Sequence, residues 1–290
     1  MDRHAFLLSL AASAAAPAAT PPAALVDGPA PLFWSEERRG RGRLGVAAID
    51  LRDGRRIEQR GEDRFPMAST FKLPLVMDVL AHVDRGAERL ERKVRYGPSD
   101  IVAAYSPVVG RNPHGGVLTV AELCAAAIEL SDNSAANLLL RTVGGPAGVT
   151  AYLRRLGDPV TRLDRTEPAL NESIPGDPRD TTTPRAMADL LARLVREPVL
   201  SAASKARLFG WMRGAKTGLD RIRAGVPPGW TVGDKTGTTN TGGNDVAILW
   251  PRSGAPVVLA VYFAEVKARD AERDAAIASV ARTVLRSFRP

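Results

Sequence analysis

Apolar residues form short continuous runs near both ends of the chain. Residues 44–51 make one such run, followed by the turn Arg52-Asp53-Gly54 and a second short segment at 56–60, which predicts two strands joined by a tight turn. Later runs, separated by glycine and proline, predict three more strands at 230–235, 245–250 and 257–264. We expect these early and late strands to share one antiparallel sheet.

The middle of the chain has a helical spacing of apolar residues instead. Leu73, Val76, Met77 and Leu80 share one helical face. Thr119 with the glutamate three residues later predicts a capping box. The predicted helices span 69–91, 119–130, 132–143, 184–196 and 201–212, and an amphipathic helix at 270–288 closes the chain.

Between these helices, residues 158–183 are rich in Pro, Asp, Thr and Gly and have little periodicity. A stretch of this length without regular structure is more often a functional Ω-like loop than a linker. The order of elements predicts an α+β fold with one catalytic unit over 27–290. Its sheet lobe comprises 27–63 and 213–290, and its all-helical lobe comprises 64–212.

The first 26 residues differ from the rest. A basic start is followed by a short apolar segment and an alanine-rich stretch, as in an export signal peptide. Arg3-His4-Ala5-Phe6-Leu7 also resembles a twin-arginine signal with its second arginine replaced. We expect an exported protein, periplasmic or secreted, without a membrane anchor in the mature chain.

The composition is that of a globular protein, with 44% hydrophobic and 25% charged residues among 290. It excludes a wholly disordered chain and a polytopic membrane protein. The formal net charge is +8, but aromatic residues are only 5%. The densest basic run, at 38–43, is interpreted as a solvated helix end that leads into a strand, and not as a nucleic-acid site.

Cysteine and histidine are too scarce for several kinds of chemistry. Cys124 is the one cysteine, which excludes an intramolecular disulfide and a C-x-x-C site, and we expect it to be a buried apolar residue. The three histidines form no H-E-x-x-H pair, which argues against a zinc hydrolase. The sequence implies no metal and no cofactor.

Ser69-Thr70-Phe71-Lys72 is the first of four motifs that carry chemistry. On a helix, residues three apart lie on one face, so Lys72 can reach Ser69. A desolvated lysine can take the proton of a serine hydroxyl and make it nucleophilic. Taken alone, the pair could equally be a helix cap and a solvated surface lysine.

Two further motifs are Ser131-Asp132-Asn133 and the segment from Glu167 to Asn171. A hydroxyl and an amide between two helices can move a proton and hold a substrate amide, although these residue types also cap helices. A carboxylate and an amide four residues apart can position a water and deprotonate it. Ordinary hydrogen bonding within the loop is the alternative for the second motif.

The fourth motif, Lys-Thr-Gly, occurs at Lys216 and again at Lys235. Lys216 follows a predicted helix and leads into a loop. Lys235 ends an apolar strand, where an edge strand could bind an extended substrate through its backbone. Gly237 would allow close approach, so we favour the motif at Lys235.

In this order and spacing, the four motifs resemble those of class A β-lactamases, from about Leu44 to the last helix. The resemblance implies an antiparallel sheet flanked by helices plus a helical lobe, as in β-lactamases and DD-peptidases, with the active site between the lobes. It implies a serine hydrolase that opens the β-lactam ring of penicillins and cephalosporins and gives antibiotic resistance.

The resemblance also assigns the catalytic roles. Ser69 is the nucleophile that forms the acyl-enzyme, and Lys72 and Glu167 share the role of base. Glu167 with Asn171 activates the water that hydrolyses the ester. Ser131 passes a proton to the leaving nitrogen.

Substrate contacts follow from the same resemblance. Arg221 is assigned to the substrate carboxylate, with Arg223 as the alternative, because no arginine follows the Lys235 strand. Backbone N–H groups of Ser69 and Thr238 are assigned to the oxyanion hole. The expected substrate-binding residues are Tyr105, Asn133, Asn171, Arg221, Lys235, Thr236, Gly237 and Thr238.

Two other functions share part of this pattern. A D-alanyl-D-alanine peptidase or penicillin-binding protein has three of the four motifs, and a β-lactam sensor is acylated without turnover. Glu167 with Asn171 argues against both, because a protein that is acylated by a β-lactam and stays so needs no group to activate a water. The expected partner is a small β-lactam, with no nucleic acid, and the expected state is a monomer.

Overall fold

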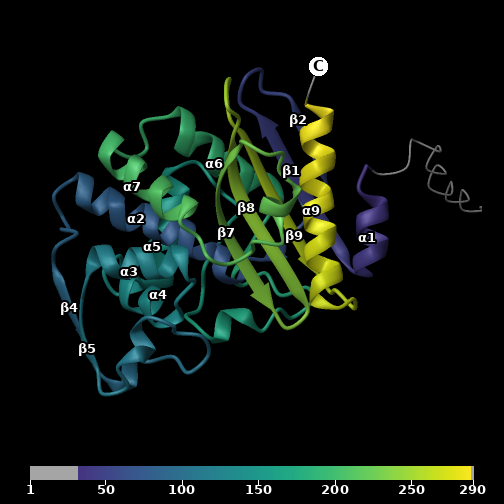
Figure 1. Ribbon diagram of the computed structural model, residues 1–290. Helices are drawn as coiled ribbons and strands as arrows, with labels where there is room; N and C mark the ends of the chain where they lie inside the picture. The colour runs from purple at the N-terminus through teal and green to yellow at the C-terminus, as the bar shows by residue number, and fades with distance from the viewer. Residues whose placement is uncertain (1–31, 289–290) are drawn as a thin grey trace, which may run out of the picture. The chain divides into compact units, whose positions relative to one another are not determined.

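The computed structural model describes residues 32–288, and the predicted export signal lies outside them. Five antiparallel strands form one sheet in the order β2-β1-β9-β8-β7 (Figure 1). The first and last apolar runs of the sequence therefore do pair, as predicted, and β7 is an edge strand. The strands span β1 Arg43–Asp50, β2 Arg56–Gln59, β7 Thr231–Thr239, β8 Gly242–Trp250 and β9 Val257–Ala264.

Both faces of the central strands are covered, which explains why β1 and β9 have continuous apolar runs and no alternation. On one face, Val46 and Leu259 pack with Ile277 and Val280 of α9 (Asp270–Ser287), beside α1 (Trp34–Gly40). On the other face, Ile49 and the rest of a larger core pack against the helical part of the chain. Figure 1 shows α9 and α1 on one side of the sheet and α2 to α7 on the other.

The helical part is built around α2 (Lys72–Asp84), whose residues 72–80 are all buried. The capping box predicted at Thr119 is present, since Thr119 Oγ1 accepts the Glu122 N–H. α6 packs on β1 and β9. The other helices are α3 Val120–Glu129, α4 Asn133–Leu140, α5 Gly145–Arg155, α6 Pro184–Arg196, α7 Ala202–Arg213 and α8 Ile222–Gly225.

The first predicted helix is shorter than expected. The chain forms a 3₁₀ helix at Ala68–Phe71 before α2 begins, and α2 ends at Asp84 because Gly86 adopts a left-handed conformation with φ 75°. Helix α5 was not predicted. Gly144 and Gly145 do stop the preceding helix, with φ 83° and 72°, but the chain starts a new helix at once.

Short pairs of strands complete the helical part. β4 (Lys93–Tyr96) pairs with β5 (Gly116–Thr119), and β3 (Phe65–Pro66) pairs with β6 (Thr181–Thr182). Neither pair was predicted, because such short strands have too few residues for a periodicity. The β3–β6 pair joins the segment just before Ser69 to the end of the 158–183 loop.

Candidate active site

Ser69 and Lys72 lie where the 3₁₀ helix Ala68–Phe71 meets α2. Lys72 Nζ donates a hydrogen bond to Ser69 Oγ over 2.8 Å, as their spacing predicts. Ala68, just before the serine, has φ 44°, a left-handed conformation that costs a residue with a Cβ about 1–3 kcal/mol. Strain of this kind is typical of functional sites, where the surrounding structure holds it in place.

The Lys72 amine is enclosed by oxygen atoms from two other segments. Nζ lies 2.6 Å from Asn133 Oδ1, 2.8 Å from the Ser131 carbonyl oxygen and 3.1 Å from Glu167 Oε1. Its side chain is fully buried, so the alternative of a solvated surface lysine is wrong. Ser69 remains partly exposed beside it.

The serine–aspartate–asparagine motif divides between two tasks. Asp132 is the N-cap of α4, with Oδ1 accepting the Ala135 N–H, while its Oδ2 accepts the N–H groups of Val108 and Val109. Ser131, with φ 58°, and Asn133 face Lys72 instead. The capping interpretation therefore holds for Asp132, whereas Ser131 and Asn133 contact the Lys72 amine.

Glu167 comes from the predicted loop and lies 3.4 Å from Ser69 Oγ through its Oε1. Its other oxygen, Oε2, accepts a hydrogen bond from Asn171 Nδ2 over 2.6 Å, and the Glu167 side chain is fully buried. Asn171 Oδ1 is buried without a partner among residues 32–288. The Glu167 carboxylate thus lies between the serine hydroxyl and the Asn171 amide.

Asn137 is a site residue that the sequence analysis missed. Its amide binds the Glu167 backbone twice, donating to the Glu167 carbonyl over 2.9 Å and accepting the Glu167 N–H over 3.0 Å. Asn137 is four residues after Asn133 and so lies on the same face of α4. That spacing was the signal that could have found it.

The edge strand β7 forms another wall. Lys235 Nζ donates to Ser131 Oγ at 3.0 Å, so a single hydroxyl connects it to the Lys72 cluster. A Cβ on Gly237 would lie 2.6 Å from the Met67 carbonyl oxygen, which shows how closely β7 passes the segment before Ser69. Lys216, in the other Lys-Thr-Gly triplet, is exposed and lies in a loop. Its neighbour Thr217 shares a hydrogen bond with Thr236.

Arg221 lies behind β7 with most of its donors in use. Its guanidinium binds Asp274 Oδ1, the Gly237 carbonyl oxygen, the Asn244 carbonyl oxygen and Thr238 Oγ1, each at 2.9 Å. A guanidinium has five N–H groups, so one is left in the described structure. Arg223 points elsewhere and pairs with the buried Asp234.

Tyr105 and Thr238 lie at the exposed edge of the site. Tyr105 as a residue is 56% exposed and has φ 63°. Its carbonyl oxygen accepts the Asn133 N–H at 3.1 Å. The backbone of this residue therefore holds the site, while its ring is free to contact a ligand.

Burial dominates the electrostatics of the two lysines. It lowers the pKa of the Lys72 amine, and the neighbouring Glu167 carboxylate opposes that shift. Burial also lowers the pKa of Lys235, and the positive charge of Lys72 lowers it further. A lysine whose pKa is lowered gives up its proton more readily.

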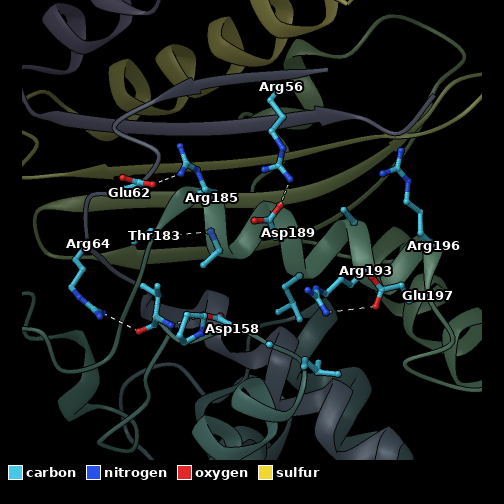
Figure 2. Close-up of a pocket in the computed structure, with 17 residues that line it drawn as sticks. Arg56, Glu62, Arg64, Asp158, Thr183, Arg185, Asp189, Arg193, Arg196 and Glu197 are labelled. Atoms are coloured by element: carbon cyan, nitrogen blue, oxygen red, sulfur yellow. Dashed lines mark hydrogen bonds and ion pairs between the residues drawn. The ribbon is translucent and has the colours of Figure 1, made fainter. Parts of the chain in front are cut away.

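A separate cavity of about 660 Å³ lies between the β2 side of the sheet, α6 and residues 156–160 (Figure 2). Its charged side chains are largely paired, as Arg56 is with Asp189. None of the predicted site residues lines it. Within residues 32–288, no group of three or more His, Cys, Asp or Glu side chains is arranged to hold a metal, and no helix is long and apolar enough to cross a membrane.

Comparisons with known proteins agree with this geometry. A family model described as the Beta-lactamase enzyme family matches residues 34–288. An ancestral class A β-lactamase of known structure is 55% identical, with 88% of this chain and 97% of that chain covered and a TM-score of 0.85. PenP from Rhodopseudomonas palustris, a proposed class A β-lactamase, is 50% identical, with 89% and 99% covered and a TM-score of 0.85.

Proposed function

Because the chain belongs to the class A β-lactamase family, a family of serine enzymes that hydrolyse β-lactams, we propose that the cluster around Lys72 carries out this reaction. The observation that supports it best is the position of Lys72 Nζ, between Ser69 Oγ at 2.8 Å and Glu167 Oε1 at 3.1 Å. The nucleophile, the base and the activator of the hydrolytic water then lie within hydrogen-bonding distance of one another.

In the first step, Ser69 Oγ attacks the lactam carbonyl carbon and loses its proton. Counting donors supports Lys72 as an acceptor of that proton. A neutral amine has two N–H groups, which the Ser131 carbonyl oxygen and Asn133 Oδ1 can accept, and its lone pair is then left for the Ser69 hydroxyl. Glu167, 3.4 Å from the same hydroxyl, shares this role.

The ring nitrogen leaves when it receives a proton. Ser131 Oγ is suited to deliver it, because it lies 3.4 Å from Lys72 Nζ and 3.0 Å from Lys235 Nζ. The C–N bond of the ring breaks, and the acyl group remains as an ester on Ser69. We assign the oxyanion of this step to the N–H groups of Ser69 and Thr238, since β7 passes close to Met67.

Hydrolysis of the ester needs a water on the side of Glu167. Glu167 takes one proton of the water as the water oxygen attacks the ester carbon, and Asn171 Oδ1, which has no partner in the described chain, accepts the other hydrogen. The bond between Ser69 Oγ and the ester carbon then breaks, Ser69 Oγ takes the proton back from Glu167 Oε1 at 3.4 Å, and the ring-opened product leaves. This arrangement favours a hydrolase over a penicillin-binding protein or a sensor, which stay acylated.

The carboxylate of the substrate binds to the positively charged groups on β7 and next to it. Lys235 and Thr236 contribute a charge and a hydroxyl, and Arg221 contributes its charge and one N–H group. Arg221 also orients the Thr238 hydroxyl. Asn133 and the exposed Tyr105 ring are assigned to the rest of the substrate, and residues 1–26 to export into the periplasm or medium.

Replacement of Glu167 by alanine tests the proposal. The variant should still acylate and then stall, because loss of a positioned base slows its step by about 10²–10⁴-fold. Intact-mass spectrometry after mixing with benzylpenicillin should show one persistent adduct, which the wild type does not accumulate. The control carries Ser69→Ala as well and should form none. A Glu167→Ala protein with wild-type turnover and no adduct would contradict the assignment.

A further inference from the structure

Two buried aspartates lie on the same face of the sheet, one in the Lys-Thr-Gly strand and one in the strand beside it. Asp234 is on β7 opposite Ala247, and Asp245 is on β8 opposite Thr236. The two are therefore diagonal neighbours, two residues out of register, whose side chains point the same way. Both side chains have no exposed surface.

Each carboxyl group has one oxygen that is bound and one that is not. The Arg223 guanidinium binds Asp234 Oδ1, and the Ile222 N–H binds Asp245 Oδ2 over 3.1 Å. Asp234 Oδ2 and Asp245 Oδ1 are buried without a partner in the described part of the chain. Buried carboxylate oxygens without hydrogen bonds are costly, and native proteins rarely keep them.

The charges around the pair do not remove this cost. Burial raises the pKa of both aspartates, and the Asp234 charge raises that of Asp245 further. The cations that oppose this are Arg223, Arg221 and Lys235, but Arg221 already pairs with Asp274 of α9. Two buried like charges on neighbouring strands favour a state in which one carboxyl keeps its proton.

We propose that Asp234 and Asp245 share one proton between their two unbound oxygens, and that this carboxyl pair positions the segment that carries Arg221. A single O–H···O bond satisfies both orphaned oxygens at once. It leaves one negative charge opposite Arg223. The pair is not in the catalytic machinery proposed above.

The route from the pair to the substrate site is short. Asp245 holds the N–H of Ile222, the residue after Arg221. Arg221 in turn holds the Gly237 carbonyl oxygen and the Thr238 hydroxyl. This second half of the inference rests on the proposed function, whereas the shared proton does not.

The shared proton is tested without any substrate. In Asp245→Asn, an amide N–H replaces the shared proton, and the carbonyl oxygen keeps the hydrogen bond from the Ile222 N–H. In Asp234→Asn, the amide N–H likewise replaces the shared proton, and the carbonyl oxygen keeps the Arg223 guanidinium as its donor. Each single variant should melt close to the wild type. In Asp234→Asn/Asp245→Asn, two amide NH₂ groups face each other, and the melting temperature should fall by more than the two single changes together. If both aspartates were ionised, the double variant would be no worse than the single ones.

Infrared difference spectroscopy of the free protein gives an independent readout. The wild type above pH 7 should show the C=O band of one protonated carboxyl group, and either single Asn variant should lose it. Absence of the band in the wild type, or its survival in both variants, would overturn the shared proton even if turnover followed the proposed mechanism.

Kinetics test the positioning role. Asp245→Leu removes the acceptor for Ile222, so KM for benzylpenicillin should rise about fivefold or more with kcat little changed, given the usual value of one hydrogen bond. Asp245→Asn, which keeps that acceptor, should keep the wild-type KM. Equal KM values in the two variants would show that the pair does not position Arg221. Such a result would not contradict the proposed role of Ser69 as the nucleophile.

Discussion

Asp180 offers a direct test of how the loop that carries Glu167 is held. Its buried carboxylate accepts the N–H of Asp164 at 2.8 Å, the N–H of Arg165 at 2.9 Å and the Nε–H of Arg165 at 2.6 Å. The Arg165 side chain is only 17% exposed, so solvent reaches neither partner easily. One side chain thus closes the two ends of the loop on each other.

The perturbation is Asp180→Asn. The new carbonyl oxygen can keep the two hydrogen bonds from backbone N–H groups. The new NH₂ group replaces the oxygen that accepted the Arg165 Nε–H, so that two hydrogen-bond donors face each other. Breaking a buried ion pair from one side costs about 3–5 kcal/mol. We expect the lower end of that range, because Arg165 still has Glu172 at 2.5 Å. About 3 kcal/mol corresponds to a roughly 100-fold larger open population of the loop.

Hydrogen exchange over residues 164–180 measures that population directly. Protection there should fall by about two orders of magnitude, and deacylation should slow because Glu167 is misplaced more often. Glu172→Gln is the matched control, since it removes the exposed partner of the same arginine and should cost no more than about 1 kcal/mol. Unchanged exchange in Asp180→Asn, or equal effects in the two variants, would refute the reasoning.

Three other predictions follow from the same structure. Ser69→Ala should lose at least ~10³-fold in turnover while its circular dichroism stays that of the wild type. Arg221→Ala should lose ~10–100-fold in kcat/KM, the value of one or two charged hydrogen bonds, whereas Arg223→Ala should mainly lower the melting temperature because it strands a buried carboxylate. Burial raises the pKa of Asp78 to about 6. The folded protein therefore keeps a proton on Asp78 that the unfolded chain loses near pH 4. As the pH rises from about 4 through 6, the contribution of Asp78 makes folding less favourable. Asp78→Asn should therefore stabilise the protein at pH 7 by ~1–2 kcal/mol, after allowance for solvent screening, and have little effect at pH 4 in urea titrations.

The parts of the fold that the sequence predicted are those with a strong local signal. The predicted strand at 257–264 coincides with β9, because every residue in it is buried on one face or the other. The capping box at Thr119 fixes the start of α3 for a similarly local reason. Helix α5 lacked such a signal, since only Val149, Tyr152 and Leu153 form its buried face.

For the site, residue types were predictable but contacts between distant segments were not. The spacing of Ser69 and Lys72 predicts their contact because it is local. That Asn137 holds the backbone of Glu167 depends on how α4 meets a loop thirty residues further along. Nor does the sequence reveal that most Arg221 donors are used inside the protein. Such facts depend on tertiary packing, which no periodicity encodes.

The sheet order has a consequence for when the enzyme becomes active. β1, near the start of the chain, pairs along its whole length with β9, from Arg43 opposite Ala264 to Asp50 opposite Val257. The strand that carries Lys235 reaches β1 only through β8 and β9. During synthesis β1 therefore cannot pair with β9 until β9 has been made, more than two hundred residues later, and the five-stranded sheet cannot form before then. A ribosome-bound chain that ends before β9 has Ser69, Lys72, Glu167 and Lys235 in full, and we expect it to hydrolyse nothing.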